Sequence, residues 1–206
     1  MKNLSFLPIF LFVTLLATNV AAQSEMKFVD RVALEAGAGY LIPMSPDQGI
    51  STSDYAGFRN FYVGANYEFT NLLGLRLTYA NNSFQDTNDS SLGLTHHKFM
   101  AEGTFNIIES IDMAPNPFEV LAHAGAGFSL GKSKQTSGID KMGTLQVGLM
   151  PMYRITDNFS LHFDATYVIN LKQNYGYNGK QAKAGGGNVT GEYFNVSVGV
   201  GVKIGF

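Results

Sequence analysis

The sequence has 206 residues, a formal net charge of −2, no cysteine, no tryptophan, and 13% aromatic residues. The near-neutral charge, without a basic run, argues against a nucleic-acid partner, and the lack of cysteine excludes a disulfide-stapled scaffold or an anchor through an N-terminal cysteine. High aromatic content without tryptophan is unusual for a soluble enzyme and suits strands that anchor at a membrane interface.

The first 22 residues are predicted to be a signal peptide. Lys2 supplies a positive start, residues 6–16 are apolar apart from Thr14, and the small residues at 20–22 fit cleavage after Ala22. This apolar run is too short for a spanning helix, and no later segment approaches about 18 uninterrupted apolar residues. We therefore expect a mature chain of one domain over residues 23–206.

Eight segments of the mature chain alternate apolar residues with small or polar ones, which is the period of a β-strand with two different faces. No segment sustains the helical period of 3.6. In chain order, the predicted strands cover residues 32–40, 61–69, 75–80, 97–107, 118–130, 144–153, 159–169 and 194–206. Pro151 cannot donate a ladder hydrogen bond, so a bulge or strand end is predicted there.

The final segment shows the alternation most clearly. Its apolar residues are Phe194, Val196, Val198, Val200, Val202, Ile204 and Phe206, and every residue between them is small or polar. The segment is about as long as a strand that crosses a bilayer at a tilt. It therefore predicts the closing strand of a membrane β-barrel.

The charged residues of the strands fall on the polar face. A basic residue on the lipid face at mid-bilayer costs about 2–4 kcal/mol, so a membrane barrel requires this segregation. A soluble antiparallel barrel or sandwich is the alternative, but it would turn its large apolar rings inward, away from the charges. The residues predicted to line a polar lumen are Glu35, Glu68, Arg76, Lys98, Glu102, Glu119, His123, His162, Asp164 and Lys203.

We therefore expect an all-β protein: an eight-stranded, antiparallel, up-and-down transmembrane β-barrel. It should close between its first and last strands, because lipid cannot satisfy an unpaired edge. Long predicted connections alternate with short ones at 70–73 and 155–158, as outside loops alternate with periplasmic turns in outer-membrane barrels; 108–117 is longer than expected. The even strand number places both termini in the periplasm. The long connections are 42–56, 82–95, 131–141 and 171–191.

Charges inside a narrow barrel must find partners. Glu68 and Arg76 flank the 70–73 turn and should face each other across a hairpin, whereas Glu35 and Lys203 should lie near the closing seam. The favoured interpretation is a lumen plugged by salt bridges, because an eight-stranded barrel is only just wide enough for side chains. The alternative is a narrow porin-like channel for ions or small solutes, which opens when partners exchange.

The histidines do not form a metal site in this interpretation. His96 and His97 are neighbours on a strand, so they point to opposite faces. His123 and His162 face inward from strands separated by a third, and a zinc site needs three or four converging ligands. No metal ligand and no cofactor-binding residue is predicted.

Catalytic residues are not predicted either. His162, Asp164 and Ser160 have the residue types of a hydrolase triad, but they lie on one strand without a nucleophile elbow. His96, near Asp89 and Ser90, is the only cluster placed like the active residues of barrel enzymes, which lie at the outer rim. A solvated loop is the better explanation of that cluster, so we expect a non-enzymatic protein.

Four segments carry a resemblance to a known family: LAHAGAGF at 121–128, KMG at 141–143, PMYRITDNF at 151–159 and FNVSVG at 194–199. They resemble the N-terminal barrel of OmpA-family outer-membrane proteins of Bacteroidetes-type bacteria, and the resemblance covers nearly the whole mature chain. It implies a bacterial outer-membrane barrel with a structural, envelope-integrity and surface-interaction role. Family members often continue into a periplasmic peptidoglycan-binding domain, which we do not expect here because the chain ends at Phe206.

The resemblance also implies partners. Gly201, Ile204 and Phe206 resemble the C-terminal signal that the barrel-assembly machinery reads. Outer-membrane lipids and lipopolysaccharide should surround the barrel, and the four long connections should present a surface for an extracellular ligand.

Overall fold

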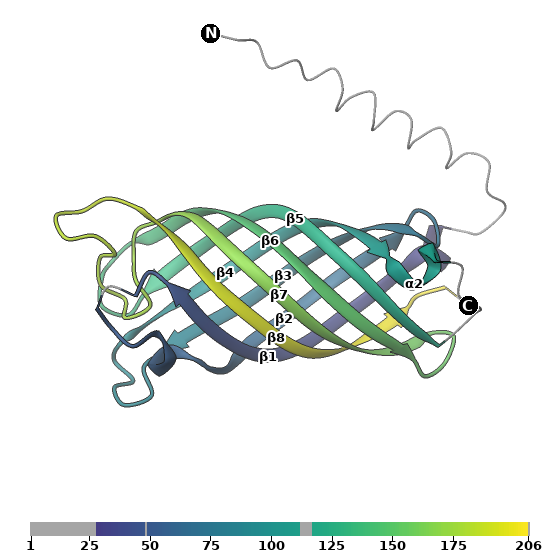
Figure 1. Ribbon diagram of the computed structural model, residues 1–206, viewed down its shortest axis with the longest axis horizontal. Coiled ribbons are helices and arrows are strands. Elements are labelled where there is room, and N and C mark those ends of the chain that lie inside the picture. Colours follow the sequence, from purple (N-terminus) through teal and green to yellow (C-terminus); the bar gives the residue numbers. More distant parts are fainter. Residues whose placement is uncertain (1–27, 48, 112–116, 206) are drawn as a thin grey trace, which may run out of the picture.

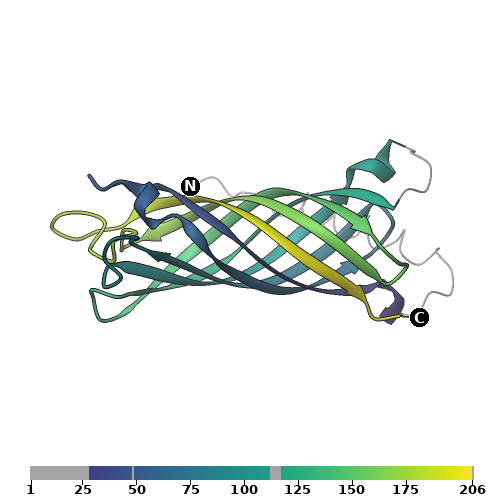
Figure 2. The ribbon, with the colours of Figure 1, turned by 90° about the horizontal axis from the view of Figure 1, so that it is seen from below.

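A computed structural model describes residues 28–47, 49–111 and 117–205. The predicted signal peptide and Phe206 lie outside these residues. The described chain forms a closed barrel in which every strand pairs antiparallel with its sequence neighbour and β1 pairs with β8, so the predicted fold is confirmed (Figures 1 and 2). The strands are β1 (Val32–Ser45), β2 (Gly57–Glu68), β3 (Leu73–Gln85), β4 (Gly93–Asn106), β5 (Phe118–Ser133), β6 (Ile139–Arg154), β7 (Phe159–Gln173) and β8 (Val189–Lys203).

The two ends of the barrel differ. The connections 46–56, 86–92, 134–138 and 174–188 gather at one end, here named the loop end (Figure 1, left). The connections 69–72, 107–117 and 155–158 lie at the other, the turn end, where the chain enters β1 and leaves β8. Among the described residues, η1 (Phe28–Arg31) precedes β1, and the connections contain η2 (Thr52–Tyr55) and α2 (Ile107–Ser110). Within the described ranges, no helix is long and apolar enough to cross a membrane.

The strands are longer at the loop end than the sequence pattern predicts. β3 and β4 continue to Gln85 and from Gly93, so the predicted connection 82–95 shrinks to 86–92, and the predicted connection 131–141 shrinks to 134–138. The polar residues at these strand ends favour a loop in the sequence pattern, but the backbone pairing of the strands continues through them. The long connections therefore rise from a barrel that extends beyond its apolar belt.

The two faces of the strands are separated as predicted. Phe163 and Val198 are 43% and 58% exposed on the outer surface, whereas Glu102 and Asp164 are 1% and 4% exposed in the lumen. Large apolar side chains cover the outside of the closed barrel and charged side chains fill its inside. This is the reverse of a water-soluble barrel, because a soluble barrel buries its apolar face.

Two local predictions need correction. Pro151 leaves a gap in the ladder between β6 and β7, but the pairs on both sides keep one register and β6 continues to Arg154, so there is neither a bulge nor a strand end. Ile107 is not in a strand, because Asn106 caps α2 by accepting a hydrogen bond from the backbone N–H of Glu109 at 3.3 Å.

Candidate functional site

A cluster of ionised groups fills the half of the lumen nearer the turn end. Arg76 Nε donates to Glu35 Oε1 at 2.6 Å, its Nη2 lies 3.0 Å from Asp164 Oδ2, and its Nη1 lies 3.7 Å from Glu102 Oε2. The guanidinium is only 2% exposed and also packs over the Tyr62 ring. One arginine from β3 therefore ties together carboxylates from β1, β4 and β7.

His123 of β5, the strand next to β4, completes this cluster. Its Nδ1 lies 2.6 Å from Glu102 Oε1 and its Nε2 lies 3.3 Å from Asp164 Oδ1. Only the Nδ1 contact is a hydrogen bond, because Nε2 has no hydrogen-bond partner among the described residues. We name Glu35, Arg76, Glu102, His123 and Asp164 the central charge cluster.

Lys98 lies close to this cluster. It shares the inner face of β4 with Glu102, and its Nζ donates to Gln146 Oε1 at 2.6 Å and lies 5.8 Å from the centre of the Tyr193 ring. The three carboxylates of the cluster therefore lie among Arg76, Lys98 and the His123 ring, which are the partners that buried acids require.

The small residues of the strands make room for this packing. A Cβ at Gly148 would clash with the His123 imidazole, because the backbone of β6 passes directly against the ring. Glycine at 148 thus leaves room for the ring in the narrow interior of an eight-stranded barrel.

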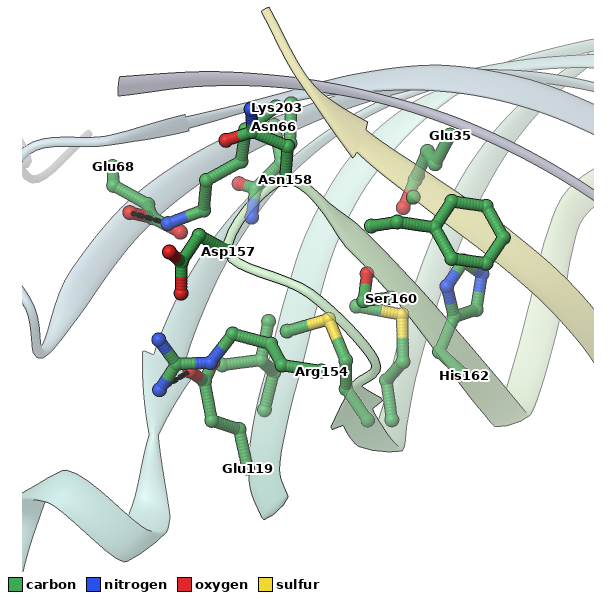
Figure 3. Close-up of a pocket in the computed structure, with 16 residues that line it drawn as sticks. Glu35, Asn66, Glu68, Glu119, Arg154, Asp157, Asn158, Ser160, His162 and Lys203 are labelled. Atoms are coloured by element: carbon green, nitrogen blue, oxygen red, sulfur yellow. Dashed lines mark hydrogen bonds and ion pairs between the residues drawn. The ribbon is translucent and has the colours of Figure 1, made fainter. Parts of the chain in front are cut away.

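Two more ion pairs lie at the turn end, where the lumen opens (Figure 3). Lys203 Nζ lies 3.1 Å from Glu68 Oε2, and both side chains are about one third exposed. Arg154 Nη2 lies 2.7 Å from Glu119 Oε1. The pocket between these pairs and His162 has a volume of about 30 Å³, which is room for about one water molecule.

The predicted pairing of Glu68 with Arg76 is therefore wrong. The hairpin register sets Arg76 opposite Asn66 and Glu68 opposite Gly74, so the two charges are not cross-strand partners. Arg76 instead reaches across the lumen, and Glu68 finds Lys203 on β8. Glu35 and Lys203 both lie at the seam between β1 and β8, as expected, but they pair with other groups.

His162 and Ser160 do not form a triad with Asp164. His162 Nε2 contacts the Tyr62 hydroxyl, whereas Asp164 contacts Arg76, His123 and the Thr166 hydroxyl. Among the described residues, no group of three or more histidine and acidic side chains could hold a metal ion.

The loop end of the lumen is closed by an apolar cluster that the sequence interpretation missed. It is here named the outer aromatic cluster and consists of Leu41, Tyr55, Phe84, Val168, Tyr177 and Tyr193. Ile50 and Leu92 of the connections pack against it. Leu41, Phe84, Val168 and Tyr193 all lie on the inward face of their strands, so the period-2 pattern could have located them if inward apolar residues had been noted.

The sequence suggested that His96 lies with Asp89 and Ser90, but in the structure it lies beside this cluster. Its ring is completely buried and packs against Phe84 and Tyr193. The extension of β4 to Gly93 turns His96 into the lumen. A buried ring cannot act at an outer rim, and this removes the basis for a catalytic role. His97 points outward, where Nδ1 meets the Tyr79 hydroxyl at 2.9 Å.

The connection 174–188 folds back over the loop end. Asp140 accepts hydrogen bonds from the backbone N–H and the side-chain amide of Asn174, at 2.6 and 2.7 Å. Tyr177 inserts into the outer aromatic cluster and donates to the carbonyl of Glu192 at 2.6 Å. Burial raises the pKa of the Tyr177 phenol well above its usual value.

The connection 86–92 is braced by its own acids. Asp86 accepts from the backbone N–H groups of Asn88 and Asp89, and these bonds hold the pKa of Asp86 below its usual value. The Ser91 hydroxyl and backbone N–H likewise lower the pKa of Asp89. Nearby, burial raises the pKa of Tyr55 to about 12. This connection is therefore an ordered surface.

Two of the three residues of the expected assembly signal are described. Gly201 pairs with Glu35 across the seam, and the backbone N–H of Ile204 donates to the carbonyl of Val32 at 3.0 Å. The Ile204 side chain is exposed on the outside. Phe206 lies outside the described residues.

No family model and no curated protein matches the chain. Several solved structures are similar in fold, among them the following three. Neisserial surface protein A is 17% identical, with a TM-score of 0.57, and the match covers 84% of this chain and 96% of that one. A major outer membrane protein from Thermus thermophilus is 14% identical, with a TM-score of 0.54 and coverage of 83% and 97%. The outer membrane protein OprG from Pseudomonas aeruginosa is 10% identical, with a TM-score of 0.50 and coverage of 83% and 94%.

The chain therefore has the fold of eight-stranded outer-membrane β-barrels. At these identities the likeness establishes the fold alone.

Proposed function

We propose that this protein is a non-enzymatic, OmpA-like outer-membrane β-barrel that supports the cell envelope and presents its loop end as an interaction surface. The exposed apolar belt supports the membrane location, because such a surface in water would drive aggregation. Members of this belt come from all eight strands and include Leu34, Phe61, Leu77, Phe99, Phe128, Leu145, Val147, Leu161, Phe163, Val198 and Val202.

The lumen of this barrel is plugged in our proposal. The observation that carries it is the binding of Arg76 of β3 by Glu35 of β1 at 2.6 Å and by Asp164 of β7, on the opposite wall of the barrel, at 3.0 Å. An ion crossing the lumen would have to break this cluster and then pass the outer aromatic cluster, where Phe84, Tyr177 and Tyr193 are completely buried. Two barriers in series, one ionic and one apolar, suit a structural barrel better than a pore.

The orientation follows the precedent of outer-membrane barrels, with the turn end and both chain ends in the periplasm and the loop end outside. The signal peptide, cleaved after Ala22, would deliver residues 23–206 to the barrel-assembly machinery. Outer-membrane lipids and lipopolysaccharide would surround the barrel, and the loop end would meet an extracellular partner. The folded-back connection 174–188 and the braced connection 86–92 would make that surface a fixed one.

Conductance across a planar lipid bilayer tests the plug. The full mature chain, shown to be folded by the upward shift of its gel band on boiling, should insert without steady conductance steps. The Glu68→Ala and Phe61→Leu variants, one at the turn-end mouth and one on the outer surface, should be equally silent.

Steady openings of the wild-type barrel would overturn the plug. If these openings disappeared in Arg76→Ala and Glu68→Ala but persisted in Phe61→Leu, the protein would be a narrow porin-like channel for ions or small solutes instead.

A further inference from the structure

Three lysines from adjacent strands lie together on the outer surface near the loop end. Lys132 of β5, Lys141 of β6 and Lys172 of β7 are all exposed. Lys132 pairs with Ile139, which lies two residues before Lys141 on β6. Gly143, two residues after Lys141, pairs with Leu171, the residue before Lys172 on β7. Lys132 and Lys141 are therefore diagonal neighbours on one sheet face, which lie about 7–8 Å apart, and Lys172 lies on the next strand beside them. We name these three residues the lysine patch.

A β-bulge turns Lys172 to this surface. The pairing of β7 with β8 shifts between Asn170 and Gln173, which are both completely buried, whereas Leu171 and Lys172 between them are both exposed. Strict alternation would direct Lys172 into the lumen together with Asn170.

The bulge strains the backbone. Lys172 has φ 62°, the left-handed conformation that is costly for any residue except glycine, and it is the one non-glycine residue with positive φ in the described chain. Backbone strain that re-aims a side chain is a feature of functional positions.

The lysine patch has no acidic partner. None of its side chains makes a hydrogen bond or ion pair within the described chain. The nearest outward acid on β8, Glu192, is already engaged by the Tyr167 hydroxyl at 2.8 Å. The exposed apolar side chains of Phe128, Leu145 and Leu171 lie on the same strands, toward the middle of the barrel.

We propose that the lysine patch binds the phosphorylated headgroup of a membrane lipid in the outer leaflet. Lysine ammonium groups bind phosphate oxygens as point charges, and basic clusters beside an apolar membrane surface recognise anionic headgroups. The apolar surface below would receive the acyl chains of the same molecule, which a free phosphate ion lacks. The proposal rests on the outer-membrane location proposed above.

Lipid binding to the folded full-length mature barrel in a neutral detergent tests the proposal. Lipid A is titrated into the protein and the bound lipid is counted by native mass spectrometry. The triple variant Lys132→Gln, Lys141→Gln, Lys172→Gln should lose about tenfold or more in affinity. The matched triple variant Lys134→Gln, Lys180→Gln, Lys183→Gln removes the same charge from exposed loop lysines and should bind as the wild type does.

Three results would overturn the proposal. Equal losses of lipid A affinity in the two triple variants would show that the lipid is attracted by the overall charge of the protein only. Displacement of lipid A by excess inorganic phosphate would identify a site for a free anion. Absence of lipid binding to the wild type would remove the site altogether, and the barrel role would still stand if the same preparation shifts on boiling and inserts into vesicles.

Discussion

At the scale of single residues, the molecule depends on one buried arginine. Arg76 is the only cation within reach of Glu35 in the described chain and also contacts Asp164 and Glu102. Removal of one partner of a buried ionic cluster leaves uncompensated charges out of water, which costs far more than loss of a surface pair.

The Arg76→Ala variant should therefore lose about 3–5 kcal/mol of the free energy of unfolding. Lys203→Ala, which breaks the partly exposed pair with Glu68 at the turn end, should lose only about 0–1 kcal/mol. Urea unfolding of both variants in lipid vesicles measures the difference. If both variants lost a similarly small free energy of unfolding, the contacts of Arg76 in the central charge cluster would not stabilise the barrel as we expect.

Lys172 allows a second test at this scale. Relief of about 1–2 kcal/mol of left-handed strain outweighs the additional backbone entropy of glycine, about 0.4–1 kcal/mol. Lys172→Gly should therefore stabilise the barrel, while Lys132→Gly, at a regular strand position, should destabilise it. The same urea experiment compares the two. A loss of stability in Lys172→Gly would show that the bulge is not strained.

At the scale of elements, Asp140 of β6 secures the connection 174–188. It accepts two hydrogen bonds from Asn174 and lies 3.3 Å from the backbone N of Tyr175. Hydrogen bonds to a charged group contribute about 1.5–3 kcal/mol. The connection should therefore loosen without them, while the strands on either side stay paired.

Trypsin reports this loosening, because Lys180 and Lys183 lie in the connection and are exposed. Asp140→Ala should be cleaved there at least tenfold faster than the wild type, while its boiling-dependent gel shift is unchanged. Asp157→Ala, in the connection at the turn end, serves as the control and should not change the cleavage. Unchanged cleavage in Asp140→Ala would mean that Tyr177 alone holds the connection.

The sequence pattern predicted which way each lumen residue faces but not which residues meet. Period-2 alternation places Arg76, Glu102 and Asp164 inside because it depends only on local backbone geometry. Their contacts depend on strand tilt and stagger, which bring β1, β4 and β7 to one level of the lumen and separate Glu68 from Arg76. The bulge at Lys172 also breaks the alternation, so no periodic rule could have placed that residue.

At the scale of the whole molecule, closure between β1 and β8 encloses the central charge cluster and the outer aromatic cluster in one lumen. The closed ladder leaves no unpaired edge, which is the condition for a sheet to stand in lipid. Closure could be predicted because the last strand is amphipathic along its whole length. The outer aromatic cluster was missed because it forms only when long strand ends and the connection 174–188 converge, and it makes the loop end of the lumen apolar rather than polar.

The absence of tryptophan from the sequence permits a direct test of the central claim, that the outer face meets lipid and the inner face does not. Phe61 and Tyr62 are sequence neighbours on β2, one exposed on the outside and one buried in the lumen. Single Phe61→Trp and Tyr62→Trp variants are folded into vesicles that contain brominated lipids, which quench tryptophan fluorescence on contact. We expect strong quenching of the tryptophan at 61 and little at 62; equal quenching, or the reverse order, would contradict the account.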